Sequence, residues 1–160
     1  MAGRKTWRDK LLDSKDLPKV VRLNENAQKH WKAVTMAVPS PLEVNSIMSG
    51  VPEGRLITIG EIRKIVARKH GADIGCPLTC GIFSWIAAHA AVEQAEEDRT
   101  AMIPYWRTLK ANGELNPKYP GGIEEQKRRL EAEGFTVVPK AGKYVVLNYE
   151  KYIQGGFFPT

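Results

Sequence analysis

Two helical patterns joined by a loop that contains Gly75 and Pro77 constrain the fold of this chain most. The first pattern opens at Thr58-Ile59-Gly60-Glu61, a capping box in which the threonine hydroxyl accepts from the third amide along and the glutamate reaches back. One apolar face then follows at helical spacing, formed by Ile62, Ile65 and Val66. His70-Gly71 is typical of a helix end. We therefore expect a helix between Thr58 and His70.

The second helix of the pair is expected to be longer. A loop from Ala72 to Leu78 separates the two, and Thr79 is the expected cap of a helix that runs to about Glu97. Apolar residues along it fall near one face. Two helices in this arrangement predict a helix-turn-helix.

The remaining segments divide the chain into three parts. Trp7 and Trp31 argue that residues 1–40 are not wholly disordered, and this extension is expected to form a short helix and an extended strip. Prolines then mark the start of a domain over 41–135, with a helix over 42–49 and another over 123–133 that ends at Gly134. Residues 136–160 predict a β-hairpin around Ala141-Gly142. The fold class expected is mainly α with small β.

Positive charge is concentrated in the first 40 residues. The formal net charge is +6, and residues 1–40 hold nine Lys and Arg against four acids, which is +5 of that total. A basic extension on a nearly neutral domain is typical of contact with a polyanion, although small basic proteins without such a partner are also common.

The bulk composition limits the other classes. Of 160 residues, 26% are charged and 42% hydrophobic, no apolar run approaches a membrane span, and residues 1–20 lack the apolar core of a signal peptide. We expect a cytoplasmic protein that makes no membrane contact. The two cysteines, Cys76 and Cys80, have no second Cys or His pair at zinc spacing, so reduced thiols and no metal or cofactor are expected.

Three short motifs in the second half carry a family resemblance. They are Ile103-Pro104-Tyr105-Trp106-Arg107, then Tyr119-Pro120-Gly121-Gly122, then Glu133-Gly134. From Leu42 to about Gly134 the chain resembles the DNA-binding domain of the O6-alkylguanine-DNA alkyltransferases. That family carries Ile-Pro-Cys-His-Arg and Tyr-x-Gly-Gly at the corresponding places. The resemblance implies a winged helix-turn-helix domain, with the basic extension standing where the family has a separate N-terminal domain.

The resemblance also implies that the acceptor chemistry is lost. Tyr105 stands at the family's cysteine and Trp106 at its histidine, while Glu133 stands at its glutamate. A phenol with a pKa of about 10 is a poor nucleophile near neutral pH. The chain therefore looks like an alkyltransferase-like protein, which binds lesions without repairing them.

The resemblance places an everted base in a pocket of aromatic and glycine residues. The residues expected to form it are Tyr105, Trp106, Tyr119, Gly121 and Gly122. Plain core packing of Tyr105 and Trp106 is the alternative.

Two family positions are changed on the side that faces DNA. The arginine that fills the gap left by the base aligns with Cys80, and the tyrosine that turns the target phosphate aligns with Ile59. Phe83 or Trp85 could act as the wedge instead, or could belong to the core. The DNA-contact residues we expect are Arg55, Thr58, Thr79, Cys80, Gly81, Phe83, Ser84, Trp85, Arg107, Lys110 and Lys118. Arg55, Lys110 and Lys118 are candidate phosphate clamps, or else ordinary surface charge.

The leading interpretation is a non-enzymatic protein that binds double-stranded DNA at a damaged base and supports repair. It is expected to be a monomer, nucleoid-associated when bound, with excision-repair proteins as possible partners. The second interpretation is a DNA glycosylase that uses Asp73 and Glu133. The third is a transcription factor, disfavoured because the second helix opens without Arg, Asn or Gln to contact base edges. Cys76 is expected to be a buried thiol rather than a relocated alkyl acceptor.

Overall fold

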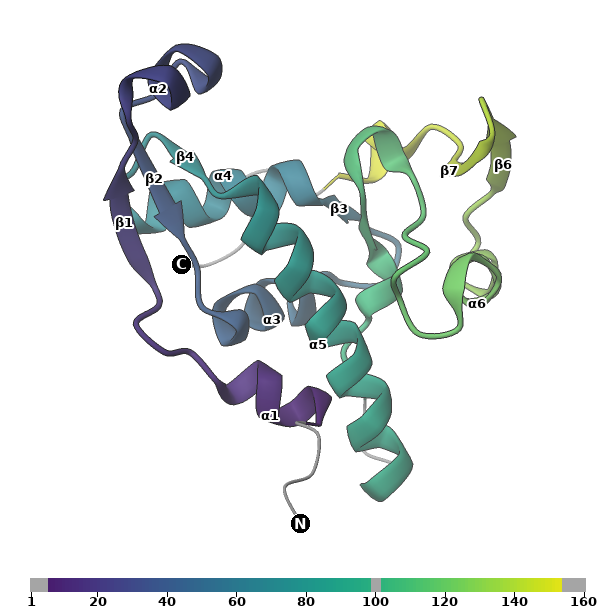
Figure 1. Ribbon diagram of the computed structural model, residues 1–160. Helices are drawn as coiled ribbons and strands as arrows, with labels where there is room; N and C mark the ends of the chain where they lie inside the picture. The colour runs from purple at the N-terminus through teal and green to yellow at the C-terminus, as the bar shows by residue number, and fades with distance from the viewer. Residues whose placement is uncertain (1–5, 99–101, 154–160) are drawn as a thin grey trace.

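A computed structural model describes residues 6–98 and 102–153, and these form a mainly helical protein with three small sheets (Figure 1). The fold class expected from the sequence is thus confirmed. The helices are α1 (Trp7–Leu12), α2 (Glu25–Trp31), α3 (Pro41–Ser49), α4 (Ile59–His70), α5 (Pro77–Asp98) and α6 (Gly122–Ala132). The strands are β1 (Lys19–Arg22), β2 (Thr35–Val38), β3 (Ile57–Thr58), β4 (Ile74–Gly75), β5 (Thr108–Leu109), β6 (Val137–Lys140) and β7 (Lys143–Val146). Three 3-10 turns complete the chain, at Tyr105–Arg107, Ala111–Gly113 and Tyr149–Tyr152.

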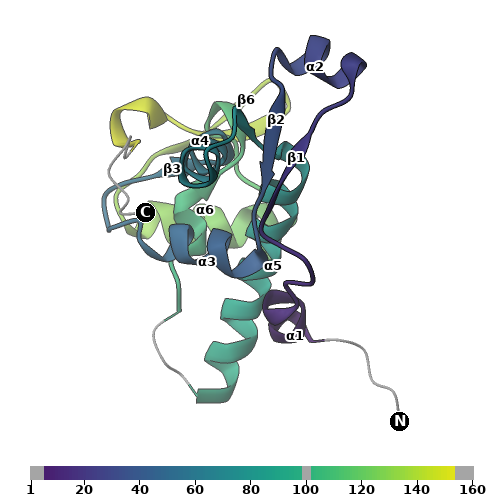
Figure 2. The same ribbon diagram turned by 90° about the vertical axis from the view of Figure 1, so that its left-hand side faces the viewer.

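Two hydrophobic clusters hold these elements together. The larger lies between α3, α4 and α5, where Met48, Ile62 and Val66 are fully buried. The smaller joins β3 and β5 to α6 and the β6–β7 hairpin through Leu109 and Leu130, which are also fully buried. Figures 1 and 2 show α5 running through the middle of the molecule between the N-terminal and C-terminal elements.

Local capping signals set the helix ends, although only the threonine half of the expected capping box forms, because the Glu61 carboxylate pairs with Lys64 at 3.7 Å and makes no bond to the Thr58 amide. The Thr58 hydroxyl accepts from the Glu61 amide at 3.3 Å and begins α4. Gly71 ends that helix in the left-handed region, with φ of 66°. Gly134 follows α6 with φ of 95°. The expected helices over 42–49 and 123–133 and the hairpin around Ala141-Gly142 are likewise present.

The start of α5 corrects one expectation. The helix begins at Pro77 and not at Thr79, because the fixed φ of proline suits the first position of a helix. The connection from α4 is therefore shorter than expected and contains the short strand β4. Thr79 lies inside the first turn, where its hydroxyl is buried and has no hydrogen-bond partner among the described residues.

The N-terminal segment contains more structure than the sequence indicated. The short helix and extended strip are confirmed as α1 and β1, but α2 and β2 were not predicted. β2 pairs antiparallel with β1 and parallel with β4, so one sheet joins residues 19–38 to the loop between α4 and α5. The basic residues Arg4 and Lys5 lie outside the described residues.

Helix α1 packs against the second half of α5. The Trp7 ring stacks on the His89 ring with centroids 4.3 Å apart. The Glu93 carboxylate accepts from the backbone amides of Trp7 at 3.2 Å and Arg8 at 3.1 Å, which stabilises the N-terminus of α1. Part of the acidic end of α5 is therefore used within the protein. No helix in the described part of the chain is both long and apolar enough to span a membrane.

Candidate nucleic-acid interface

A groove opens where the first turns of α4 and α5 meet the two loops that follow β5. Its volume is about 460 Å³. The lining residues are Ile59, Gly60 and Arg63 of α4, Pro77, Leu78, Gly81, Ile82 and Trp85 of α5, and Lys110, Ala111, Asn116 and Lys118 of the loops. The groove therefore lies on the helix pair that the sequence pattern indicated.

Three cations surround an apolar floor in this groove. Lys118 Nζ lies 6.0 Å from the Trp85 ring centroid. Arg63 Nε donates to the carbonyl of Gly75 at 2.8 Å, which fixes that side chain between α4 and β4. Gly75 is required there because a Cβ would collide with the Arg63 backbone. Arg63 was not predicted as a site residue, although its position four residues after Ile59 puts both on one helix face.

The expected DNA-contact residues separate into two groups. Gly81, Trp85, Lys110 and Lys118 line the groove. The others do not, and they have different surroundings. Cys80, Ser84 and Thr58 are buried, the Thr79 hydroxyl is buried, and Phe83 packs against the core. Arg55 is exposed just before β3, and Arg107 is held by hydrogen bonds.

Cys80 points into the core from the first turns of α5. Its side chain is fully buried, and burial raises the pKa of the thiol to about 12. Cys76 is also buried, and its sulfur lies 3.5 Å from the Thr79 amide that donates to it. Both thiols are therefore shielded from solvent. Among the described residues, no three His, Cys, Asp or Glu side chains gather in a metal-binding arrangement.

A second concavity, which we call the Tyr105 hollow, lies between the 116–121 loop and α6. Its volume is about 430 Å³, and it is lined by Val92, Tyr105, Pro120, Gly121, Glu124, Glu125, Arg128 and Arg129. Gly121 turns the chain into α6 with φ of 78°, and a Cβ there would lie 2.5 Å from Glu125 Cβ. Both the conformation and the close approach require glycine at this position.

Tyr105 forms the inner wall of this hollow. Its side chain has no exposed surface, and its hydroxyl has no hydrogen-bond partner among the described residues. Burial raises the pKa of this phenol. The rings of Trp106 and Tyr119 pack edge-on against it, with centroids at 5.3 and 5.4 Å. Of the expected pocket residues, Tyr105 and Gly121 thus line the hollow, whereas Trp106, Tyr119 and Gly122 are its neighbours.

Trp106 and Arg107 both bind the carboxylate of Glu133. Trp106 Nε1 donates to Glu133 Oε2 at 2.9 Å, and Arg107 Nη2 donates to the same oxygen at 2.6 Å. Arg107 also donates through Nε to Oε1 at 2.9 Å and through Nη1 to the Val51 carbonyl at 2.7 Å. An indole N–H has no lone pair to accept a proton, so this cluster holds a charge-neutralised carboxylate and no base.

The two carboxylates considered for glycosidic cleavage lie in different parts of the structure. Asp73 Oδ2 accepts from the amides of Val34 at 2.9 Å and Thr35 at 3.1 Å, and these bonds lower its pKa. Asp73 therefore fastens the α4–α5 loop to the start of β2, whereas Glu133 fastens the Tyr105–Arg107 turn. The structure does not bring them together, and neither lines the Tyr105 hollow.

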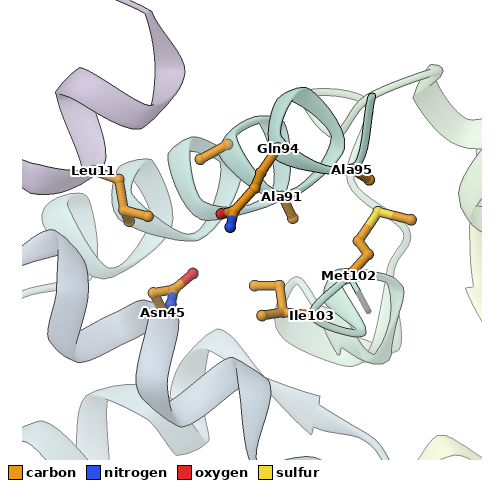
Figure 3. A pocket seen from close by; sticks show the side chains of 8 residues that line it. Leu11, Asn45, Ala91, Gln94, Ala95, Met102 and Ile103 are labelled. Atoms are coloured by element: carbon orange, nitrogen blue, oxygen red, sulfur yellow. The ribbon is translucent and has the colours of Figure 1, made fainter. Parts of the chain in front are cut away.

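A third, smaller cavity lies between α1, α3 and α5, apart from the groove and the hollow. Its volume is about 90 Å³, and its lining includes Leu11, Met102 and Ile103. Figure 3 shows the amides of Asn45 and Gln94 facing each other across it.

No protein-family model and no curated protein matches this chain. Among solved structures it is similar to S. pombe Atl1 in complex with damaged DNA containing O6-carboxymethylguanine, with 22% identity, a TM-score of 0.49 and coverage of 71% of this chain and 92% of that one. It is also similar to S. pombe ATL in complex with DNA, with 23% identity, the same TM-score and the same coverage.

Proposed function

We propose that this protein is a non-enzymatic DNA-binding protein of the alkyltransferase-like class, which recognises a damaged base turned out of the duplex into the Tyr105 hollow. The α4–α5 pair and the β6–β7 hairpin act as a winged helix-turn-helix in this account. The duplex lies over the groove, where Arg63, Lys110 and Lys118 bind phosphates. Affinity then comes largely from neutralised phosphates and falls with salt.

One observation carries the proposal: the same loop forms a wall of both concavities. Asn116 and Lys118 face the groove, while Pro120 and Gly121, a few residues further on, face the Tyr105 hollow. The loop is fastened to α5 by the hydrogen bond between His89 Nε2 and the Lys118 carbonyl, at 2.7 Å. A base that leaves the stack above the groove therefore needs to pass only this loop to enter the hollow.

The chemistry of the hollow suits a polar aromatic guest. A buried hydroxyl without a well-aligned partner costs about 1–3 kcal/mol. The Tyr105 hydroxyl has no exposed surface and lies beside Arg129, so a base edge would reach it only once the Arg129 side chain moves aside. The guanidinium of Arg129 lies 5.8 Å from the Tyr105 ring centroid and 4.8 Å from that of Trp106. Enzymes that read everted bases use the same combination of hydrogen bonds and packing surfaces.

In this account the protein binds the base and accepts no alkyl group from it. Tyr105 and Trp106 stand where the family that the sequence resembles has a thiol and an imidazole. The Glu133 carboxylate is already bound to Trp106 and Arg107. The role of the protein would then be to mark the lesion for other proteins, and excision-repair proteins are the partners we propose. We propose that it acts as a monomer in the cytoplasm, associated with the nucleoid when bound.

The experiment that tests this function compares two duplexes that differ in one O6-methylguanine. At physiological salt the lesion duplex should bind about tenfold more tightly, a difference of about 1.4 kcal/mol. The protein mass should stay unchanged after incubation, and no abasic site should form on the DNA. Equal affinities would contradict lesion recognition, whereas abasic-site formation would favour the glycosylase.

A further inference from the structure

Residues 19–38 form a projecting arm made of β1, α2 and β2. The two strands pair antiparallel from Lys19 opposite Val38 to Arg22 opposite Thr35. Helix α2 sits at the tip, above α4 and β4 (Figures 1 and 2). The Asn24 side chain caps α2 by accepting from the Ala27 amide at 2.8 Å. Gln28 Nε2 donates to the Leu23 carbonyl at 2.7 Å. The tip is therefore a built element and not a loose basic tail.

The tip carries positive charge that the protein itself does not neutralise. Arg22, Lys29 and Lys32 are exposed and form no ion pair with any residue in the described ranges. Lys19, by contrast, binds Asp16 at 2.8 Å. Glu25 is the one acidic residue of the segment 19–38. Solvated cations gathered in this way are available to an anionic partner.

A direct contact joins the tip to the DNA groove. The guanidinium of Arg63 lies 5.3 Å from the ring centroid of Trp31, and the same Arg63 lines the groove. Trp31 keeps 38% of its surface exposed, although it lies against this cation. Asp73 holds the base of the tip by accepting from the amides of Val34 and Thr35. The tip is thus fixed beside the groove, at the end where α4 carries Arg63.

We propose that the tip of this arm binds the sugar–phosphate backbone of the same duplex, beyond the groove, with Lys29 and Lys32 on phosphates. The inference rests on the proposed function, because it takes the groove to hold DNA. Duplex DNA is the partner that fits, because Arg63 lines the groove and also contacts Trp31 of the tip, so the cations of the two regions lie side by side. Such contacts add affinity without sequence information. In this proposal the arm contacts a part of the duplex that lies beyond both the groove and the Tyr105 hollow.

The test measures how affinity for undamaged duplex depends on salt. The variant K29Q/K32Q removes two tip charges. The matched control R68Q/K151Q removes two exposed charges from the end of α4 and from the Tyr149–Tyr152 turn, which lie outside the groove and the arm. Glutamine keeps a polar side chain without branching at Cβ, including at Lys32, whose backbone is left-handed with φ of 54°. Thermal unfolding should be the same for all three proteins.

The tip variant should reduce the slope of log affinity against log salt by about 0.9 for each lost phosphate contact, and so by about 1 to 2 in total. The control should keep the wild-type slope and affinity. A tip variant that behaves like the control would overturn the inference while leaving the proposed function intact. A wild-type protein that binds no duplex would overturn both. A third outcome is that the wild type forms a dimer, that K29Q/K32Q does not, and that the slope of log affinity against log salt is the same in both. This outcome would overturn the inference and assign the tip to contact with a second copy of the chain.

Discussion

Trp106 Nε1 donates a hydrogen bond of 2.9 Å to Oε2 of Glu133, the oxygen that also accepts from Arg107. An indole N–H can only donate, so Trp106 cannot act as a base toward this carboxylate. Glu133 is held by two donors in a part-buried cluster, so a change at Glu133 should affect the stability of the fold.

Glu133→Gln should therefore destabilise the fold strongly. The side chains of Glu133 and Arg107 are each only 12% exposed, and removal of the carboxylate charge leaves the Arg107 guanidinium buried without its counter-ion. We expect a loss of about 3 kcal/mol in the free energy of unfolding, measured by urea denaturation. Asp16→Asn is the control, because Asp16 is 70% exposed and its partner Lys19 is 45% exposed, and it should cost less than about 1 kcal/mol. A similar loss in the free energy of unfolding for the two variants would show that the buried Glu133–Arg107 pair stabilises the fold no more than an exposed pair does.

Tyr105→Phe should weaken binding to a damaged duplex without lowering the stability of the fold. The hydroxyl has no partner among the described residues, so its removal should leave the free energy of unfolding unchanged or raise it by about 1 kcal/mol. Affinity for a duplex with O6-methylguanine should fall about five- to tenfold, because the bond to the base is lost. Affinity for undamaged duplex should not change. A variant that binds both duplexes like the wild type would remove Tyr105 from base recognition.

Alkaline pH should destabilise the protein through Cys80. Burial raises the pKa of this thiol from 9.0 to about 12, so between these values the unfolded chain loses a proton that the folded chain keeps. The stability that results is present below pH 9 and is lost as pH rises toward 12. The slope approaches about 1.4 kcal/mol per pH unit. Buried Tyr105 and Tyr119, whose pKa values burial also raises, contribute in the same direction to wild type and variant alike. Urea denaturation between pH 9 and 10 should therefore show a shallower slope for Cys80→Ala. Equal slopes would contradict the assignment.

The groove cations should control the affinity for DNA regardless of damage. Lys110→Gln combined with Lys118→Gln removes two positive charges that line the groove. The slope of log affinity against log salt should fall by about 2, and affinity for damaged and undamaged duplexes should fall by the same factor. R68Q/K151Q serves again as the charge-matched control. An effect confined to the damaged duplex would place these lysines at the base and not at the backbone.

Local signals explain which helices the sequence could predict. Thr58 and Gly71 mark the ends of α4, and Gly134 marks the end of α6, because caps depend only on neighbouring residues. Helix α2 was missed because none of its residues is buried, so it leaves no apolar period. Strand β2 was missed because it depends on pairing with Ile74 and Gly75, far along the chain. Local patterns cannot encode that contact.

The candidate site was predictable one residue at a time but not as an arrangement. Lys110 and Lys118 could be named as exposed cations, while Arg63 gains its role from contacts with Gly75 and Trp31 that lie outside its own helix. The error at Thr79 arose because proline both ends and begins helices, and here Pro77 begins α5. The resemblance named Trp106 and Glu133 one at a time, and the hydrogen bond between them is visible only in the coordinates.

The account depends most on the hollow beside Tyr105, and a substitution that fills it gives the most direct test. Val92 lines the hollow of about 430 Å³ from α5, and Val92→Trp would place an indole ring in it and obstruct the entry of a base. The measurement is the ratio of dissociation constants for undamaged and O6-methylguanine duplexes, in the wild type and in V92W. We predict a ratio of about ten in the wild type. It should fall to about one in V92W, with affinity for undamaged DNA preserved. A wild-type ratio near one, or a ratio that V92W leaves unchanged, would contradict the account.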